Sequence, residues 1–444
     1  MANVRLPTEL WLRIFDDNTD LLDRYDLSVV VRTCKTFREL AIKNLYQHVV
    51  WKNPTSLVHS LGFFRRVRGL DEENFVLPKT LTIGVSRMSK NGRSAIVGED
   101  ARILPASRGR WFPTTPMERR DFTSLAVLDS GDTACDFRIP LFASSALYES
   151  MLDFTQSLVS LRELTFTNAI LPDTVNPLLH RLPNLRKLRL EMCVISPTVS
   201  DGNVDHTVLP ITELTLRSLY HVIDMQHQPN QGLEHLNPNK VFCLATAQSL
   251  ETLRIDTTAR IFALFDRPRS PPVPPNLKRL FLYRPRLTKN DSRVADMAPT
   301  QRRLQETAAL MLRIIRFLTG APKIESISTC FAFGDAHLQV PLLPPNHFDA
   351  EHLREFSGPI SSFSFPPLTL ARNLRAVHFI EDQSMFISSA QRFAGDLERL
   401  EVLSLRTTAA WNDEIVLAAC SVFSNVLRMR IEYAGPGPND VGPR

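Results

Sequence analysis

The side chains best suited to metal chemistry lie between residues 193 and 243. Thiol, imidazole and carboxylate groups are the ligands that zinc accepts. The candidates are Cys193, Asp205, His206, His221, Asp224, His227, His235 and Cys243. Fifteen residues separate His206 from His221, and six separate His221 from His227, so no two of these three histidines share a helical face or a tight turn. We interpret the stretch as a polar loop with two buried thiols, and we expect no metal and no cofactor.

Catalytic signatures give no stronger indication of chemistry. The sequence contains no HExxH, no GxSxG, no glycine-rich phosphate loop and no dinucleotide fingerprint. Only 16 of the 444 residues are Gly. This pattern favours a protein that binds other molecules, and we expect no catalytic residue in it.

The first 52 residues predict three short amphipathic helices. Apolar residues recur with helical spacing in three blocks, 6–15, 26–34 and 36–45. Asp26 is a good N-cap for the second block, and Thr36 with Glu39 forms a capping box for the third. Three helices in 46 residues are close to the size limit below which a core cannot support itself. We expect their apolar faces to rest on the rest of the chain or on another protein.

The string LPTELWLRIF…DLSVVVRTCKTFRELA…LYQHVVW resembles an F-box, the three-helix module that binds the Skp-family adaptor of SCF cullin–RING ubiquitin ligases. The stretch between Phe15 and Asp26 is a few residues longer than usual, and Phe37 stands where the family often has Trp. The resemblance implies an interaction with the adaptor and, through it, with a cullin. The residues that it implies for adaptor binding are Leu6, Pro7, Leu10, Ile14, Phe15, Leu27, Val30, Cys34, Phe37 and Leu40.

A second pattern runs through residues 53–434. A Leu is followed by a charged residue and then, two positions later, by another apolar residue, as in Leu161-Arg162-Glu163-Leu164 and Leu185-Arg186-Lys187-Leu188. With looser copies included, the second apolar positions are Leu81, Leu125, Leu164, Leu188, Leu214, Leu253, Leu280, Ile327, Phe356, Val377, Leu403 and Met429. Seven of the eleven gaps between them fall within the 20–29-residue period of leucine-rich repeats.

Helical stretches precede several of these predicted strands, for instance 147–154 before Leu164 and 304–318 before Ile327. Each helix–strand unit can bury its face only against its neighbours. The predicted fold is therefore α/β, with a three-helix F-box over 1–52 and an irregular leucine-rich-repeat-like solenoid, a horseshoe, over 53–434. A basic insertion at 84–120 and a Pro-rich loop at 265–275 interrupt the repeats. The tail 435–444 is predicted to be disordered.

Residues that flank the buried Leu-x-Leu anchors should point from the strands into the concave face of such a solenoid. These candidate target-binding residues are Arg189, Thr215, Arg254, Phe281, Tyr283, His378, Arg406 and Arg430. Arg, Tyr and Phe are enriched at binding hot spots. The hypothesis is a basic, aromatic surface that selects an acidic or phosphorylated protein. The alternative is a solvated strand face with ordinary arginines.

Composition limits the choice of function. The net charge of +5 equals the excess within 84–120, so the remaining residues are neutral overall and a nucleic-acid-binding fold is disfavoured. The six Cys residues form no CxxC pair, which fits reduced thiols in the cytoplasm or nucleus. The longest apolar helical stretch, 308–318, contains two Arg residues and is too short to span a membrane.

The predicted function is that of a non-catalytic substrate receptor in an SCF ubiquitin ligase, with an adaptor on the F-box and a protein target on the solenoid. Two alternatives remain. The chain could be a leucine-rich-repeat scaffold outside any ligase, its first helices serving as a cap. It could also bind nucleic acid through 84–120.

Overall fold

The structure is a computed structural model of the 444-residue chain. The residues that it describes are 29, 32–35, 47–51, 78–84, 145–167, 169–171, 174–195, 205–217, 219–221, 241–257, 259–265, 272–283, 300–330, 351–360, 373–381, 386–387, 399–407 and 413–433. They belong to two compact units. Unit 1 comprises Met1–Gly202 and Leu219–Gln228, and unit 2 comprises Asn203–Ser218 and Pro229–Arg444.

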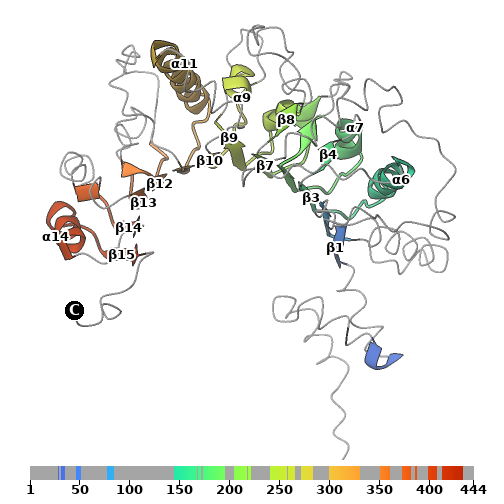
Figure 1. Ribbon diagram of the computed structural model, residues 1–444, viewed down its shortest axis with the longest axis horizontal. Coiled ribbons are helices and arrows are strands. Elements are labelled where there is room, and N and C mark those ends of the chain that lie inside the picture. Colours follow the sequence, from blue (N-terminus) through green and yellow to red (C-terminus); the bar gives the residue numbers. More distant parts are fainter. Residues whose placement is uncertain are drawn as a thin grey trace, which may run out of the picture. The chain divides into compact units, whose positions relative to one another are not determined.

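Unit 1 is built on parallel strands. They lie in the order β1 (His48–Trp51), β2 (Thr80–Gly84), β3 (Glu163–Thr167) and β5 (Lys187–Glu191). Three two-residue strands form a second parallel sheet, namely β4 (Ile170–Leu171), β6 (Val194–Ile195) and β8 (Tyr220–His221). Helices α6 (Ser145–Gln156) and α7 (Val175–His180) precede β3 and β5 along the chain, and Figure 1 shows both on the same side of the strands.

Unit 2 continues the same plan. Its parallel strands are β7 (Glu213–Arg217), β9 (Thr252–Asp256), β10 (Arg279–Tyr283), β11 (Ser326–Thr329), β12 (Glu355–Gly358), β13 (Ala376–Glu381), β14 (Val402–Thr407) and β15 (Arg428–Tyr433), paired in this order. The segments between them are η2 (His206–Val208), η4 (Phe242–Thr246), α9 (Ala259–Ala263), α11 (Thr300–Thr319) and α14 (Asp413–Val422). The expected helices at 147–154 and 304–318 are thus confirmed as α6 and α11.

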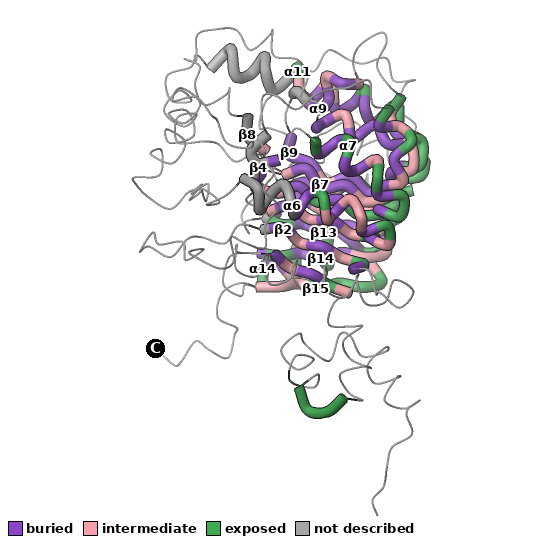
Figure 2. Tube along the Cα trace, turned by 90° about the vertical axis from the view of Figure 1, so that its right-hand side faces the viewer, coloured by how far each residue is buried: buried purple, intermediate pink, exposed green. Residues whose placement is uncertain are grey.

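The strand registers confirm the repeat alignment. Leu81 pairs with Leu164 and Leu164 with Leu188 in unit 1, and a series of such pairs runs from Leu214 to Met429 in unit 2. Within each unit, each expected strand centre therefore faces the next described one, and Leu125 lies outside the described residues. From Leu81 to Leu403 these side chains are 0–1% exposed, and Figure 2 colours the buried positions along the strands purple. Each such burial contributes about 1.5–3 kcal/mol to stability.

A shared carbonyl joins each repeat to the next. The carbonyl oxygen of Arg162 accepts the backbone N–H groups of Arg186, at 2.8 Å, and Lys187, at 2.9 Å. The same arrangement recurs down both units, for example at Glu251 with Lys278 and Arg279. In the pattern of a Leu followed by a charged residue, the carbonyl of the charged residue thus accepts hydrogen bonds from the start of the following strand.

Asparagine side chains add a second link between repeats. Asn184, Asn276 and Asn373 each precede an anchor Leu, and their amides donate to carbonyl oxygens of the preceding repeat at 2.8, 3.3 and 2.7 Å. The acceptors are Val159, Gln248 and Glu351. In the Pro-Asn dipeptides at 183–184 and 275–276, the Asn amide therefore hydrogen-bonds to the preceding repeat.

The strand β1 was not expected, because 1–52 was predicted as a three-helix module and no strand was assigned to the residues after the third helical block, 36–45. His48–Trp51 pairs with β2, and Trp51 is 2% exposed. Its indole lies 6.2 Å from the ring of Phe154 on α6, centroid to centroid. The β-branched pair Val49-Val50 and the aromatic Trp51 suit a strand better than a helix. The first module therefore ends inside the sheet of unit 1.

Three predicted segments lie partly or wholly outside the described residues. Residues 85–120 of the basic insertion, residues 266–271 of the Pro-rich loop and the tail 435–444 lie outside the described residues. At the end of the Pro-rich loop, Pro274 is buried and its carbonyl accepts the backbone N–H of Leu277 at 3.2 Å. Pro274 therefore packs into unit 2, while its neighbours Pro272 and Pro275 are exposed.

Candidate protein interaction surface

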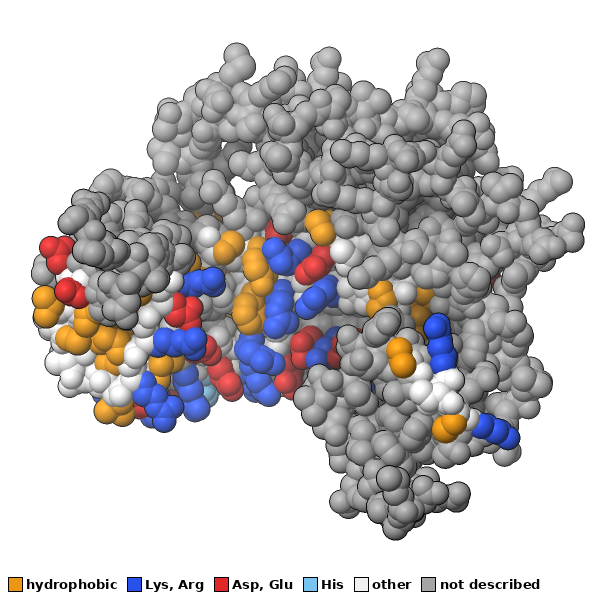
Figure 3. All heavy atoms as spheres, turned by 60° about the horizontal axis from the view of Figure 1, so that its bottom comes forward, with side chains coloured by type: hydrophobic (Ala, Val, Ile, Leu, Met, Phe, Trp, Pro, Cys, Tyr) orange, Lys and Arg blue, Asp and Glu red, His pale blue; other side chains and the backbone are white. Residues whose placement is uncertain are grey.

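The exposed face of the strands carries most of the residues expected to bind a target. Alternate strand residues point to opposite faces, so side chains beside the buried rows point outward. Figure 3 shows Lys and Arg side chains interleaved with Asp and Glu on this face. The expected residues with exposed or half-buried side chains are Arg189 on β5, Arg254 on β9, Phe281 and Tyr283 on β10, His378 on β13, Arg406 on β14 and Arg430 on β15.

Thr215 is the exception among the expected contact residues. It lies on β7 in register with Arg254, but it is only 4% exposed. Longer side chains flank it, namely Glu213 and Arg217 on its own strand and Arg254 on the next. A short side chain between long ones loses access to solvent, so the expectation that Thr215 offers a contact surface was wrong.

Two arginines and two aromatic rings meet in unit 2. The guanidinium of Arg254 lies over the ring of Phe281, 4.5 Å from its centroid. Arg217, on β7, reaches across β9 to the ring of Tyr283, with 4.0 Å from guanidinium carbon to centroid. We call Arg217, Arg254, Phe281 and Tyr283 the arginine–aromatic cluster. Each cation–π contact contributes about 0.5–2 kcal/mol and keeps a guanidinium flat against a ring.

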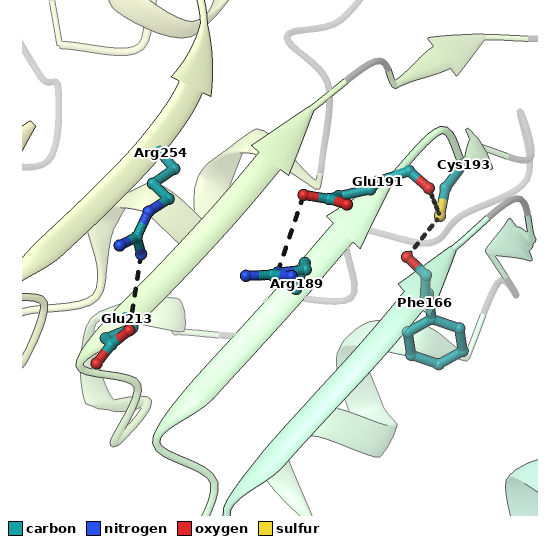
Figure 4. A network of polar contacts seen from close by, with 6 residues as sticks. All are labelled: Phe166, Arg189, Glu191, Cys193, Glu213 and Arg254. Carbon is teal, nitrogen blue, oxygen red and sulfur yellow. Dashed lines mark hydrogen bonds and ion pairs between the residues drawn. The ribbon is translucent and has the colours of Figure 1, made fainter. Parts of the chain in front are cut away.

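Acidic residues partly compensate these cations. Nη1 of Arg254 lies 3.6 Å from Oε2 of Glu213, and Nε of Arg189, in unit 1, lies 3.9 Å from Oε1 of Glu191 (Figure 4). On β13, Nε2 of His378 lies 3.3 Å from Glu355. Ion pairs at such distances and exposures are weak, about 0–1 kcal/mol. The arginines are therefore held in place but can exchange their acidic neighbours for those of a partner.

Sequence reasoning missed Arg217, although it lies on the strand face of β7. It follows Leu216, the last buried anchor of that strand, and the same alternation that singled out Tyr283 and Arg406 singles out this position. Its contact with Tyr283 joins strands that are not neighbours, so spacing along the chain does not reveal it.

Cys193 has a structural role in unit 1. The sequence predicted that this thiol is buried. The thiol is 0% exposed and lies 3.4 Å from the carbonyl oxygen of Phe166 and 3.3 Å from that of Glu191 (Figure 4). Burial raises the pKa of the Cys193 thiol from 9.0 to about 12. The protonated thiol therefore links the end of β5 to β3 in the preceding repeat.

We expect Cys193 to resist alkylation at pH 8 while the exposed Cys34, Cys330 and Cys420 react, because only the thiolate is nucleophilic.

Since the folded-state pKa of Cys193 is raised, the folded chain binds the extra proton, and its stability should fall as the pH rises from about 9 to 12. Urea unfolding at pH 7 and 10.5 measures this loss. The Cys193→Ala variant should lose less stability between these two pH values, because it lacks this thiol. An equal loss in both chains would contradict the assignment.

Only part of the candidate metal-ligand set lies among the described residues. Within the ranges that the structure describes, no three His, Cys, Asp or Glu side chains form a group able to hold a metal ion. Asp224, His227 and His235 lie outside those ranges. No helix in the same ranges is long and apolar enough to cross a membrane.

Most residues expected to bind an adaptor lie outside the described residues. They are Leu6, Pro7, Leu10, Ile14, Phe15, Leu27, Val30, Phe37 and Leu40. Cys34 is described, and it is exposed. The three-helix arrangement of this segment therefore stays a prediction.

The comparison with protein families decides the nature of the first module. Residues 4–51 match the family model described as F-box-like. The chain carries an F-box-like domain. The match spans the three predicted helical blocks and ends at Trp51, the last residue of β1. The F-box-like domain and the sheet of unit 1 therefore share a strand.

Comparisons of the whole chain add less. No curated protein matches the sequence. Among solved structures, a plant peptide hormone receptor, RGFR1 in complex with RGF2, is similar at 12% identity with a TM-score of 0.18. The similarity covers 63% of this chain and 46% of that one. Similarity at this level adds nothing to the fold assignment, which rests on the strand registers and buried rows.

Proposed function

We propose that the chain is the substrate-recognition subunit of an SCF-type cullin–RING ubiquitin ligase. In this function the F-box-like domain binds a Skp-family adaptor, and through it a cullin, while the exposed strand face holds a protein target. The observation that carries the proposal is the F-box-like match at 4–51, joined through β1 to an array of leucine-rich-repeat-like strands. Such a subunit needs no nucleophile, because it raises the effective concentration of the target near the ubiquitin carrier.

The arginine–aromatic cluster supports the second half of the proposal. A guanidinium that stacks on a ring can still donate from its N–H groups to carboxylate or phosphate oxygens. Phe281 and Tyr283 provide apolar area that a partner can cover, and both ring types are enriched at hot spots. The proposed target-binding residues are therefore Arg189, Arg217, Arg254, Phe281, Tyr283, His378, Arg406 and Arg430. The target class is a protein with acidic or phosphorylated residues, localised in the cytoplasm or nucleus.

Binding of the purified full chain to a purified Skp-family adaptor tests the first half. We expect wild type to bind, Leu6→Ala/Pro7→Ala to bind at least about tenfold more weakly, and Ile14→Asp to bind still less, because each change removes apolar area or places a charge in the predicted interface. Val208→Asp is the matched control, since Val208 is 69% exposed and lies outside residues 4–51.

A folded wild-type chain that does not bind the adaptor would exclude the ligase function. The scaffold outside any ligase would then remain as the explanation, with the F-box-like domain serving as a cap at the start of the repeats.

A further inference from the structure

The last strand differs from the strands before it in unit 2. In β14 the inward residues Leu403 and Leu405 are 0% and 1% exposed, but Met429, in register with Leu403, is 36% exposed on β15. Leu427, just before β15, is 80% exposed. In a repeat array each unit covers the apolar side of its neighbour. The final repeat thus exposes the row that a further strand would cover.

The outer edge of β15 and the surface of α14 in this repeat are exposed as well. All six residues of β15 pair with β14, and its other edge has no neighbouring strand among the described residues. On α14, Leu417 is 67% exposed and Cys420 is also exposed. An open edge next to apolar side chains is a template for pairing with another strand.

The residues that follow in the sequence do not suit this edge. Of the eleven residues 434–444, three are Pro, and Ala434 and Val441 are the apolar ones. Pro lacks the backbone N–H that a paired strand donates, and a covering strand needs alternate apolar residues. By composition, residues 434–444 do not supply a strand that would cover this edge.

The sequence of β15 is complementary to itself in the antiparallel direction. With Arg430 placed on a two-fold axis, Arg428 of one copy faces Glu432 of the other, twice, and Met429 faces Ile431 on the inward side. The two copies of Arg430 then face each other, but each is compensated within its own chain, since its Nη2 lies 2.7 Å from Oε1 of Glu432. Opposite charges directly across a strand pair are stabilising.

A head-to-tail assembly lacks this complementarity. It would place β15 of one copy beside β1 of the next, whose outward residues His48 and Val50 offer no carboxylate to Arg428 or Arg430. Two-fold dimers are also the commonest protein oligomers. We propose that two copies of this chain associate through antiparallel pairing of their β15 strands, in the register that opposes Arg428 and Glu432.

Sedimentation of the full chain over a range of concentrations measures the dimer. We expect Arg428→Glu to weaken dimerisation by at least about tenfold, because it opposes two carboxylates. Adding Glu432→Arg should restore the affinity to within about threefold of wild type, because the pair is then reversed. The charge-reversed Arg354→Glu, on an exposed residue away from β15, should leave dimerisation unchanged.

Disulfide trapping tests the register. In a chain with Ser at the exposed Cys34, Cys330 and Cys420, Arg430→Cys should form a cross-linked dimer under mild oxidation, because the two copies of residue 430 face each other. Ser404→Cys, on β14, should not. The proposal is overturned by a chain that stays monomeric, by a dimer or filament insensitive to Arg428→Glu, or by equal trapping at 404 and 430.

Discussion

Reversing two arginines on the strand face should abolish target capture while adaptor binding persists. Arg189→Glu with Arg254→Glu removes one hot-spot cation from each unit and places carboxylates where an acidic target would lie. Loss of a hot-spot contact costs about 2 kcal/mol or more, so the double reversal should weaken capture at least about a hundredfold. Arg254→Glu also loses its contact with the Phe281 ring.

Quantitative co-precipitation from cells with the proteasome inhibited measures this effect. The control is Arg181→Glu with Arg316→Glu, which makes the same charge change in each unit at exposed positions of a helix or its cap. Proteins lost with the first pair but retained with the second are the expected targets, and phosphatase treatment separates phosphorylated from acidic ones. Identical protein sets for both pairs would contradict the assignment of the strand face.

Replacing Trp51 by Ala should destabilise unit 1 by about 3–5 kcal/mol. The side chain is 2% exposed, packs near Phe154 and closes the sheet at β1. Far-UV circular dichroism of the full chain in urea should show an earlier first transition. Because β1 also ends the F-box-like domain, adaptor binding should weaken under the same conditions.

The Trp51→Phe variant separates the contribution of the aromatic ring from that of the indole N–H. Within the described part of the chain, the indole Nε1 is buried and has no hydrogen-bond partner. An unpaired buried donor costs about 1–3 kcal/mol, so Phe should recover much of the stability that Ala loses. Val159→Ala, at a 49% exposed position of unit 1, should change little. Equal destabilisation by Ala at 51 and at 159 would show that β1 is not part of the stable sheet.

The repeat core could be predicted from the sequence because its signal is local. A Leu, a charged residue and an apolar residue two positions later mark both the anchor and the strand, and in the described strands the registers align these centres. Gly358 breaks the pattern for a reason that only three dimensions show. A Cβ at this residue would lie 2.6 Å from Cγ2 and 2.8 Å from the carbonyl oxygen of Thr329 on β11. Thr329 thus fills the space that a side chain at residue 358 would need.

The exposed face was harder to predict. Alternation along a strand identified Arg254, Phe281 and Tyr283, but it could not show that Arg217 reaches across a strand or that Thr215 is covered. Both depend on side-chain length on neighbouring strands. The strand β1 was missed because its residues adjoin three helical blocks, and only pairing with β2, some thirty residues later, fixes it as extended.

The mass of the complex formed by the purified full chain, a Skp-family adaptor and its cullin tests the central claim most directly. Size-exclusion chromatography with light scattering should show all three proteins in one assembly, with equal numbers of this chain and adaptor. Ile14→Asp should leave the chain folded but outside that assembly, and Val208→Asp should join it as wild type does. A wild-type chain that is folded yet elutes apart from adaptor and cullin would contradict the ligase function.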